Sequence, residues 1–185
     1  MAKTTRTATT AGKNMMVHDE ETLLKDLFVD ELKDIYWAEK YLTKAMPKMK
    51  RAASSKELIS AIEQHLLQTE GQITRLEQVF ELMEINPRAK KCEAMEGLVK
   101  EMQNMIEEMP KGSAARDAGL IICAQKIEHY EIASYGSLVQ LAKTMGQNEA
   151  AELLQETLDE EKQTDLLLTE LAISGININA EREEA

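Results

Sequence analysis

Apolar residues recur every three or four positions through most of the chain, which is the spacing of one face of an α-helix. Turn-forming residues interrupt this pattern at Asn86-Pro87, at Pro110 to Ser113 and at Gly146. The pattern predicts four long helices, over about 19–51, 55–84, 114–145 and 148–173, and a shorter helix over about 92–108. No segment shows a convincing strand pattern, so we expect an all-α protein.

The connections between the predicted helices indicate how they are arranged. The first and second long helices are joined by only a few residues, as are the third and fourth, so each pair should form an antiparallel hairpin. The link between the second and third long helices has about 30 residues and contains the short helix. One long crossover is typical of ferritin-like bundles. We therefore expect a ferritin-like four-helix bundle with a long crossover containing a short fifth helix.

The bundle domain is expected over residues 19–175, between two tails. Residues 1–18 are rich in Thr and weakly basic, and they lack the apolar stretch of a secretory signal. We interpret residues 1–18 as a disordered N-terminal tail and residues 176–185 as a C-terminal tail.

The 185-residue chain is acidic, because 22 Lys and Arg against 33 Asp and Glu give a formal net charge of −11. Nucleic acids and anionic membranes both attract basic surfaces, so we expect neither as a partner. No apolar run approaches the length of a transmembrane helix. Cys92 and Cys123 lie far apart and form no Cys-x-x-Cys pair, which favours two reduced, structural cysteines in a cytoplasmic protein.

Polar residues on the inward stripes of the long helices are the main indication of chemistry. Each long helix places a carboxylate or imidazole group near its middle: Glu31 and Asp34, then His65, then Glu128 and Glu131, then Glu161 and Asp165. Uncompensated carboxylates cannot share an apolar core, because burial disfavours their charged form. A dinuclear iron or manganese cluster resolves the conflict, since oxygen-rich sites suit both metals.

Each of these residues, taken alone, is more often found at the boundary of an apolar stripe or in a hydrogen bond. The prediction depends on the coincidence across four helices. Helix-wheel positions also carry rotational error, so Glu160 and His129 are alternative inward residues.

Several ordered motifs resemble the YciE/YciF family of ferritin-like proteins, over about residues 19–175. The matching stretches are DELKDIYWAEKYLTKAMPKM (30–49), HLLQTEGQITRLEQVF (65–80), CEAMEGLVKEM (92–102), AQKIEHYEIASYGSL (124–138) and ETLDEEKQTDLLLTELA (156–172). The resemblance implies a rubrerythrin-like bundle, a homodimer, and a bacterial cytoplasmic protein associated with stress. It also implies a di-iron or di-manganese centre, which is inferred for the family from its fold.

The sequence departs from the wider ferritin-like pattern, which has Glu-x-x-His pairs. Ile62 stands three residues before His65, and Thr164 stands three residues after Glu161. The resemblance matches Glu31, Glu128 and Glu161 to the carboxylates of the first, third and fourth helices, with Asp165 in place of a histidine. The second helix offers only His65, with Thr69 and Gln72, so the expected site is asymmetric, weak in metal binding or vestigial.

The leading interpretation is a cytoplasmic ferritin-like stress protein with a carboxylate-rich di-iron or di-manganese site in the bundle, and whether it is a di-metal oxidoreductase is left open. With iron, the reaction would be oxidation of Fe(II) by oxygen or peroxide, and with manganese it would be peroxide disproportionation. The alternative is a non-enzymatic, dimeric stress protein with a vestigial metal site that acts through partner binding, which the Met-rich short helix favours. A third interpretation, an iron-storage cage subunit, is disfavoured by the missing Glu-x-x-His pairs.

Overall fold

A computed structural model of the protein describes residues 22–184, so the predicted tail over 1–18 lies outside the described residues. The described chain is helical and contains no strand. Its helices are α1 (Leu23–Ala52), α2 (Lys56–Leu82), α3 (Glu93–Glu108), α4 (Ala114–Thr144), α5 (Asn148–Leu171) and α6 (Asn177–Glu181), with a π-helical turn, η1 (Ala172–Ile176), between the last two. The five predicted helices correspond to α1–α5.

The starts of the helices follow from capping residues in the sequence. The hydroxyl oxygens of Thr22, Ser55 and Ser113 each accept a hydrogen bond from a backbone N–H in the first turn of α1, α2 and α4. Gly146 has a φ of +74°, a conformation that favours glycine, and it turns the chain between α4 and α5. Local sequence therefore sets most of the helix boundaries.

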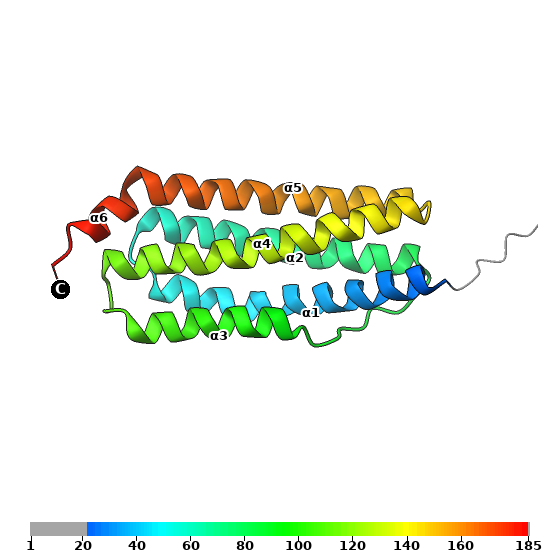
Figure 1. Ribbon diagram of the computed structural model, residues 1–185, viewed down its shortest axis with the longest axis horizontal. Coiled ribbons are helices and arrows are strands. Elements are labelled where there is room, and N and C mark those ends of the chain that lie inside the picture. Colours follow the sequence, from blue (N-terminus) through cyan, green and yellow to red (C-terminus); the bar gives the residue numbers. More distant parts are fainter. Residues whose placement is uncertain (1–21, 185) are drawn as a thin grey trace, which may run out of the picture.

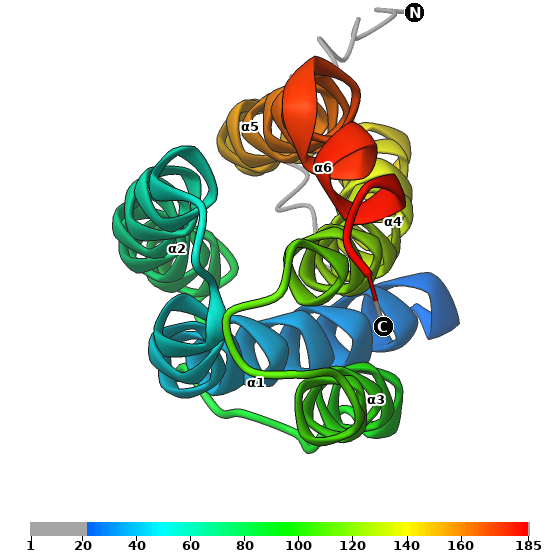
Figure 2. The ribbon, with the colours of Figure 1, turned by 90° about the vertical axis from the view of Figure 1, so that its left-hand side faces the viewer.

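The four long helices form a bundle in which α1, α2, α5 and α4 succeed one another around the axis (Figure 2). Neighbours in this ring are antiparallel, whereas α2 and α4 run in the same direction across the bundle (Figure 1). The crossover after α2 leads to α3, which packs outside the ring against α1 and α4. This is the predicted ferritin-like architecture with one long crossover.

The C-terminal segment differs from the expected tail. The chain stays helical past Gly175 through η1 and α6, as far as Glu181. Ile176 is buried, and the Glu183 carboxylate accepts hydrogen bonds from the backbone N–H groups of Ala114 and Ala115, at 3.2 and 3.0 Å. Residues 176–184 are thus packed against the start of α4.

Apolar side chains from all four long helices and from α3 fill the bundle. The largest fully buried ones are Tyr135, Phe28, Phe80, Leu32, Ile35, Leu42, Leu58, Leu76, Met95, Met102, Leu120 and Ile121. Cys92 and Cys123 are buried free thiols, as expected for structural cysteines. Among residues 22–184, no helix is both long and apolar enough to cross a membrane. The apolar core is interrupted near the middle of the bundle by the polar cluster described next.

Candidate metal centre

Five ionisable side chains meet inside the bundle, and every long helix supplies at least one. They are Glu39 from α1, His65 from α2, Glu128 and Glu131 from α4, and Glu161 from α5, and all five are buried. One possible ligand atom from each of His65, Glu128, Glu131 and Glu161 lies within 4.8 Å of the others. Glu39 is close enough for its charge to act on Glu131 and Glu161. We call these five residues the central cluster.

The imidazole of His65 faces the carboxylates. Its Nε2 atom lies 3.3 Å from Glu128 Oε1 and 3.9 Å from Glu161 Oε2. Its other nitrogen, Nδ1, lies 3.5 Å from the hydroxyl of Thr164 on α5. This contact directs Nε2, the remaining ligand atom, toward the centre of the bundle.

A second layer of hydrogen bonds holds the carboxylates in place. The Gln72 side-chain amide donates to Glu161, and also to Glu160 at 3.1 Å. The Tyr135 hydroxyl donates to Glu39. In metal sites, the hydrogen-bond partners of the metal-binding side chains fix the orientation of those side chains.

Several oxygen atoms of the central cluster are buried without a hydrogen-bond partner. They are Glu39 Oε2, Glu128 Oε2, Glu161 Oε2 and both carboxylate oxygens of Glu131, and His65 Nε2 is in the same situation. A buried polar atom left unpaired costs about 1–3 kcal/mol, and more if it is charged. His65, Glu128, Glu131 and Glu161 each place a ligand atom close to the others, so the cluster could hold a cation. A set of carboxylates with one imidazole fits iron or manganese.

Burial also changes how the cluster titrates. It raises the pKa of Glu39, Glu128 and Glu131 well above the usual glutamate value, and the nearby Glu161 raises each of them further. Burial lowers the pKa of His65, although Glu161 partly opposes that change. The imidazole is therefore held in its neutral form, which is the form that binds metals.

The structure brings together four of the seven predicted site residues: His65, Glu128, Glu131 and Glu161. The placement of Glu31 on the inward stripe was wrong, because Glu31 is exposed on the outer side of α1. Its position there is close enough to the crossover for its charge to act on Lys90.

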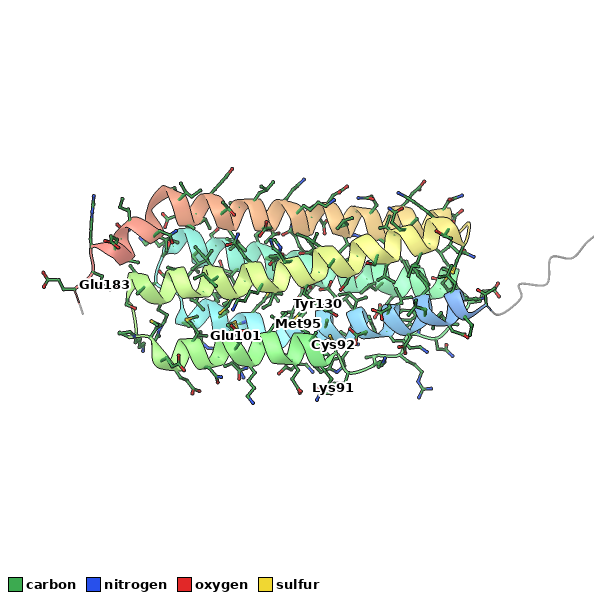
Figure 3. All side chains as sticks on the ribbon, viewed as in Figure 1. Lys91, Cys92, Met95, Glu101, Tyr130 and Glu183 are labelled. Carbon is green, nitrogen blue, oxygen red and sulfur yellow. The ribbon has the colours of Figure 1, made fainter. Side chains whose placement is uncertain are left out.

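Asp34 and Asp165 are half-buried, and both have partners outside the cluster. Asp34 accepts a 2.8 Å hydrogen bond from the Tyr130 hydroxyl, which also lies 3.0 Å from Cys92 Sγ where α3 begins (Figure 3). Asp165 accepts a 3.1 Å hydrogen bond from Gln125 and lies 3.4 Å from Nε2 of the exposed His129. Neither aspartate belongs to the group of close ligand atoms.

The alternative inward residues also lie outside the central cluster. His129 is exposed, and Glu160 is half-buried at the seam between α2 and α5, where it is bound by Gln72 and Arg75. The pairing with Arg75 accounts for Glu160 without a metal.

Sequence reasoning missed Glu39. It lies seven residues after Leu32, four after Ile35 and three before Leu42, all of which are fully buried. Glu31 instead follows Leu27 by four residues, and Leu27 is 48% exposed, so this spacing leads to the outer side of α1. Leu27 and Phe28 are adjacent in the sequence but lie on different faces of α1, so apolar spacing alone did not select the face that contains Glu39.

The fold and the central cluster define a class: helical bundles with a buried carboxylate–imidazole centre. The chain belongs to the family described as Domain of unknown function (DUF892), whose model matches residues 23–181. Protein YciF of Escherichia coli (strain K12) is 51% identical over 162 residues, which cover 86% of this chain and 96% of YciF.

Solved structures agree with this assignment. The crystal structure of the E. coli stress protein YciF matches with a TM-score of 0.80 and 48% identity, over 85% of this chain and 99% of that one. YcfI from Rhodopseudomonas palustris matches with a TM-score of 0.78 and 37% identity, over 83% and 96% of the two chains. The bundle is therefore the fold of experimentally determined relatives.

Proposed function

We propose that this chain is a stress protein like YciF, and that its bundle holds a dinuclear iron or manganese centre. The observation that carries the proposal is the central cluster, with its buried and unpaired oxygen atoms. The ionised carboxylates of Glu39, Glu128, Glu131 and Glu161 would carry four negative charges, which two divalent cations would neutralise. A pair of metal ions therefore explains the number of buried carboxylates better than one ion does.

The residues of the cluster would bind the metal through different atoms. Both oxygens of Glu131 lack partners, so this carboxylate would offer both of them to the metal. Nε2 of His65 would be a terminal ligand, with its orientation fixed by Thr164. When bound, iron or manganese supplies one-electron redox chemistry. Overall, two Fe(II) ions, one dioxygen and two protons give two Fe(III) ions and one hydrogen peroxide.

The proposal predicts which glutamate the metal requires. Glu131→Gln should reduce bound iron or manganese from about two ions per chain to one or fewer, because a neutral amide is a poorer ligand for these metals than a carboxylate. The matched control is Glu31→Gln, the same change at an exposed position of α1, and it should leave the metal content unchanged. Elemental analysis after loading and desalting measures both.

The same experiment separates the leading function from the alternative of a vestigial site. If the unmodified protein holds fewer than about 0.2 iron or manganese ions per chain after loading, the result contradicts the proposed metal centre. The raised pKa values of Glu39, Glu128 and Glu131 favour the alternative in that case, since these carboxyls would then be protonated. The homodimer and the cytoplasmic location are still predictions from the sequence.

A further inference from the structure

A small cavity adjoins the central cluster on the side toward the turn between α1 and α2. Its volume is about 30 Å³, and His65 and Glu128 line it beside the cluster. The rest of its lining includes Ala45 and Met49 from the end of α1 and Ala124 from the first half of α4. The cavity therefore extends from the cluster into the apolar core of the bundle.

Most of the cavity wall offers no hydrogen bond to a water molecule. Apart from His65, Glu128 and Thr164, which lie at the end beside the cluster, its lining residues are apolar. A buried water makes about three hydrogen bonds, so the apolar part of the cavity, around Ala45, Met49 and Ala124, does not suit one. A single water needs about 10–15 Å³ of such space, so about 30 Å³ is room for a diatomic molecule.

We propose that this cavity is a dioxygen site, and that dioxygen rather than hydrogen peroxide is the oxidant that reaches the centre from it. The inference rests on the function proposed above. Dioxygen is apolar and loses no hydrogen bonds on entering. Hydrogen peroxide would lose hydrogen bonds to water, at a cost of about 2–7 kcal/mol for each polar group left unpaired in an apolar environment. The reaction is the one balanced above, in which dioxygen takes one electron from each of two Fe(II) ions and two protons.

The test fills the cavity. Ala124→Leu puts three more carbon atoms into it from α4, and the matched control is Ala133→Leu, at an exposed position of the same helix. We expect Ala124→Leu to slow Fe(II) oxidation by dioxygen about tenfold, while oxidation by hydrogen peroxide changes less than about twofold. Ala133→Leu should change neither rate. Equal slowing of both reactions, or no slowing of either, would overturn the proposal.

A second measurement does not depend on bound metal or on the folding of a variant. Xenon is apolar and binds in dry protein cavities. Xenon-pressurised crystals or ¹²⁹Xe NMR of the metal-free, unmodified protein should show xenon beside Ala124 and His65, and its absence there would overturn the dioxygen site. If the unmodified protein binds no iron or manganese after loading but still binds xenon in the cavity, the result contradicts the proposed function alone.

Discussion

Glu131 has no exposed surface, and neither of its carboxylate oxygens has a hydrogen-bond partner. Such a side chain is stable only if it is protonated or if a cation meets it. Burial, and then the charges of Glu39, Glu161 and Glu128, raise its pKa well above the usual value. In the metal-free protein a proton therefore takes the place that we assign to the metal, so proton release should accompany metal binding.

This competition predicts how the stability of the metal-free protein depends on pH. The folded-state pKa values of Glu39, Glu128 and Glu131 are raised, so the stability they contribute is present in full below the unfolded-state pKa of about 4.3 and is lost as pH rises through the folded-state values. From pH 7 upward we expect the free energy of unfolding to fall by up to about 1.4 kcal/mol per pH unit for each carboxyl still protonated in the folded state.

Urea unfolding in the presence of a chelator, between pH 7 and 9, measures this slope. His65 contributes little there, because its pKa is lowered from about 6.5 and the imidazole is neutral in both states. Glu131→Gln should reduce the slope and Glu31→Gln should not. A free energy of unfolding that is constant over this range would contradict the protonation of Glu39, Glu128 and Glu131.

Some residues of the central cluster were predictable from spacing, and one was not. Glu128 and Glu161 stand at helical intervals from buried apolar residues on α4 and α5, so their inward position follows from periodicity. The outer side of α1 also carries apolar residues, such as the exposed Leu27, and α3 packs against α1 from outside the ring. Two overlapping apolar faces made the rotation of α1 ambiguous, and only the packing of the bundle selects Glu39.

At the level of the helices, one buried carboxylate joins the two hairpins. Asp117, near the start of α4, accepts hydrogen bonds from the backbone N–H groups of Ser54 and Ser55, at 2.9 and 2.7 Å, and from the Ser54 hydroxyl, at 2.8 Å. These groups belong to the turn between α1 and α2. The contact therefore fixes the first hairpin against the second.

Replacing this carboxylate should destabilise the bundle. Asp117→Asn puts an amide where two backbone N–H donors need acceptors, and we expect a loss of about 2–3 kcal/mol in the free energy of unfolding. Glu63→Gln is the control, because its carboxylate forms a half-exposed ion pair with Lys50 at 2.8 Å. Exposed pairs contribute about 0–1 kcal/mol. Urea unfolding compares the two variants, and equal losses would show that Asp117 contributes no more than a surface charge.

The helices were more predictable than the end of the chain. Capping residues such as Ser55 and Ser113 act within one helical turn, so a local pattern is enough to locate the starts of α2 and α4. Gly175 is also a local signal, and it predicts a helix end. The chain nevertheless continues through η1, where the buried Ile176 and the contact of Glu183 with α4 stabilise it. Those contacts are tertiary and have no local sequence pattern.

For the whole molecule, the central cluster divides the acidic surplus into two parts. The net charge of −11 is mostly a property of the surface, where many carboxylates are exposed on long helices. Four glutamates of the cluster are buried, and they come from α1, α4 and α5, while α2 contributes His65. A metal bound there would contact every helix of the ring. Of the long helices and α3, only α3 supplies no residue to the cluster.

Metal binding should consequently stabilise the bundle as one unit. A ligand present at 100 times its dissociation constant adds about 2.7 kcal/mol, which corresponds to about 5–10 °C in Tm for a chain of this size. With Mn(II), hydrogen exchange should slow in α1, α2, α4 and α5 together, because the ligands tie these helices to one point, and it should slow less in α3. The Glu31→Gln variant should show the same shift, and Glu131→Gln should lose most of it. Slower exchange confined to one helix, or an equal shift in Glu131→Gln, would place the metal on the acidic surface instead of in the centre of the bundle.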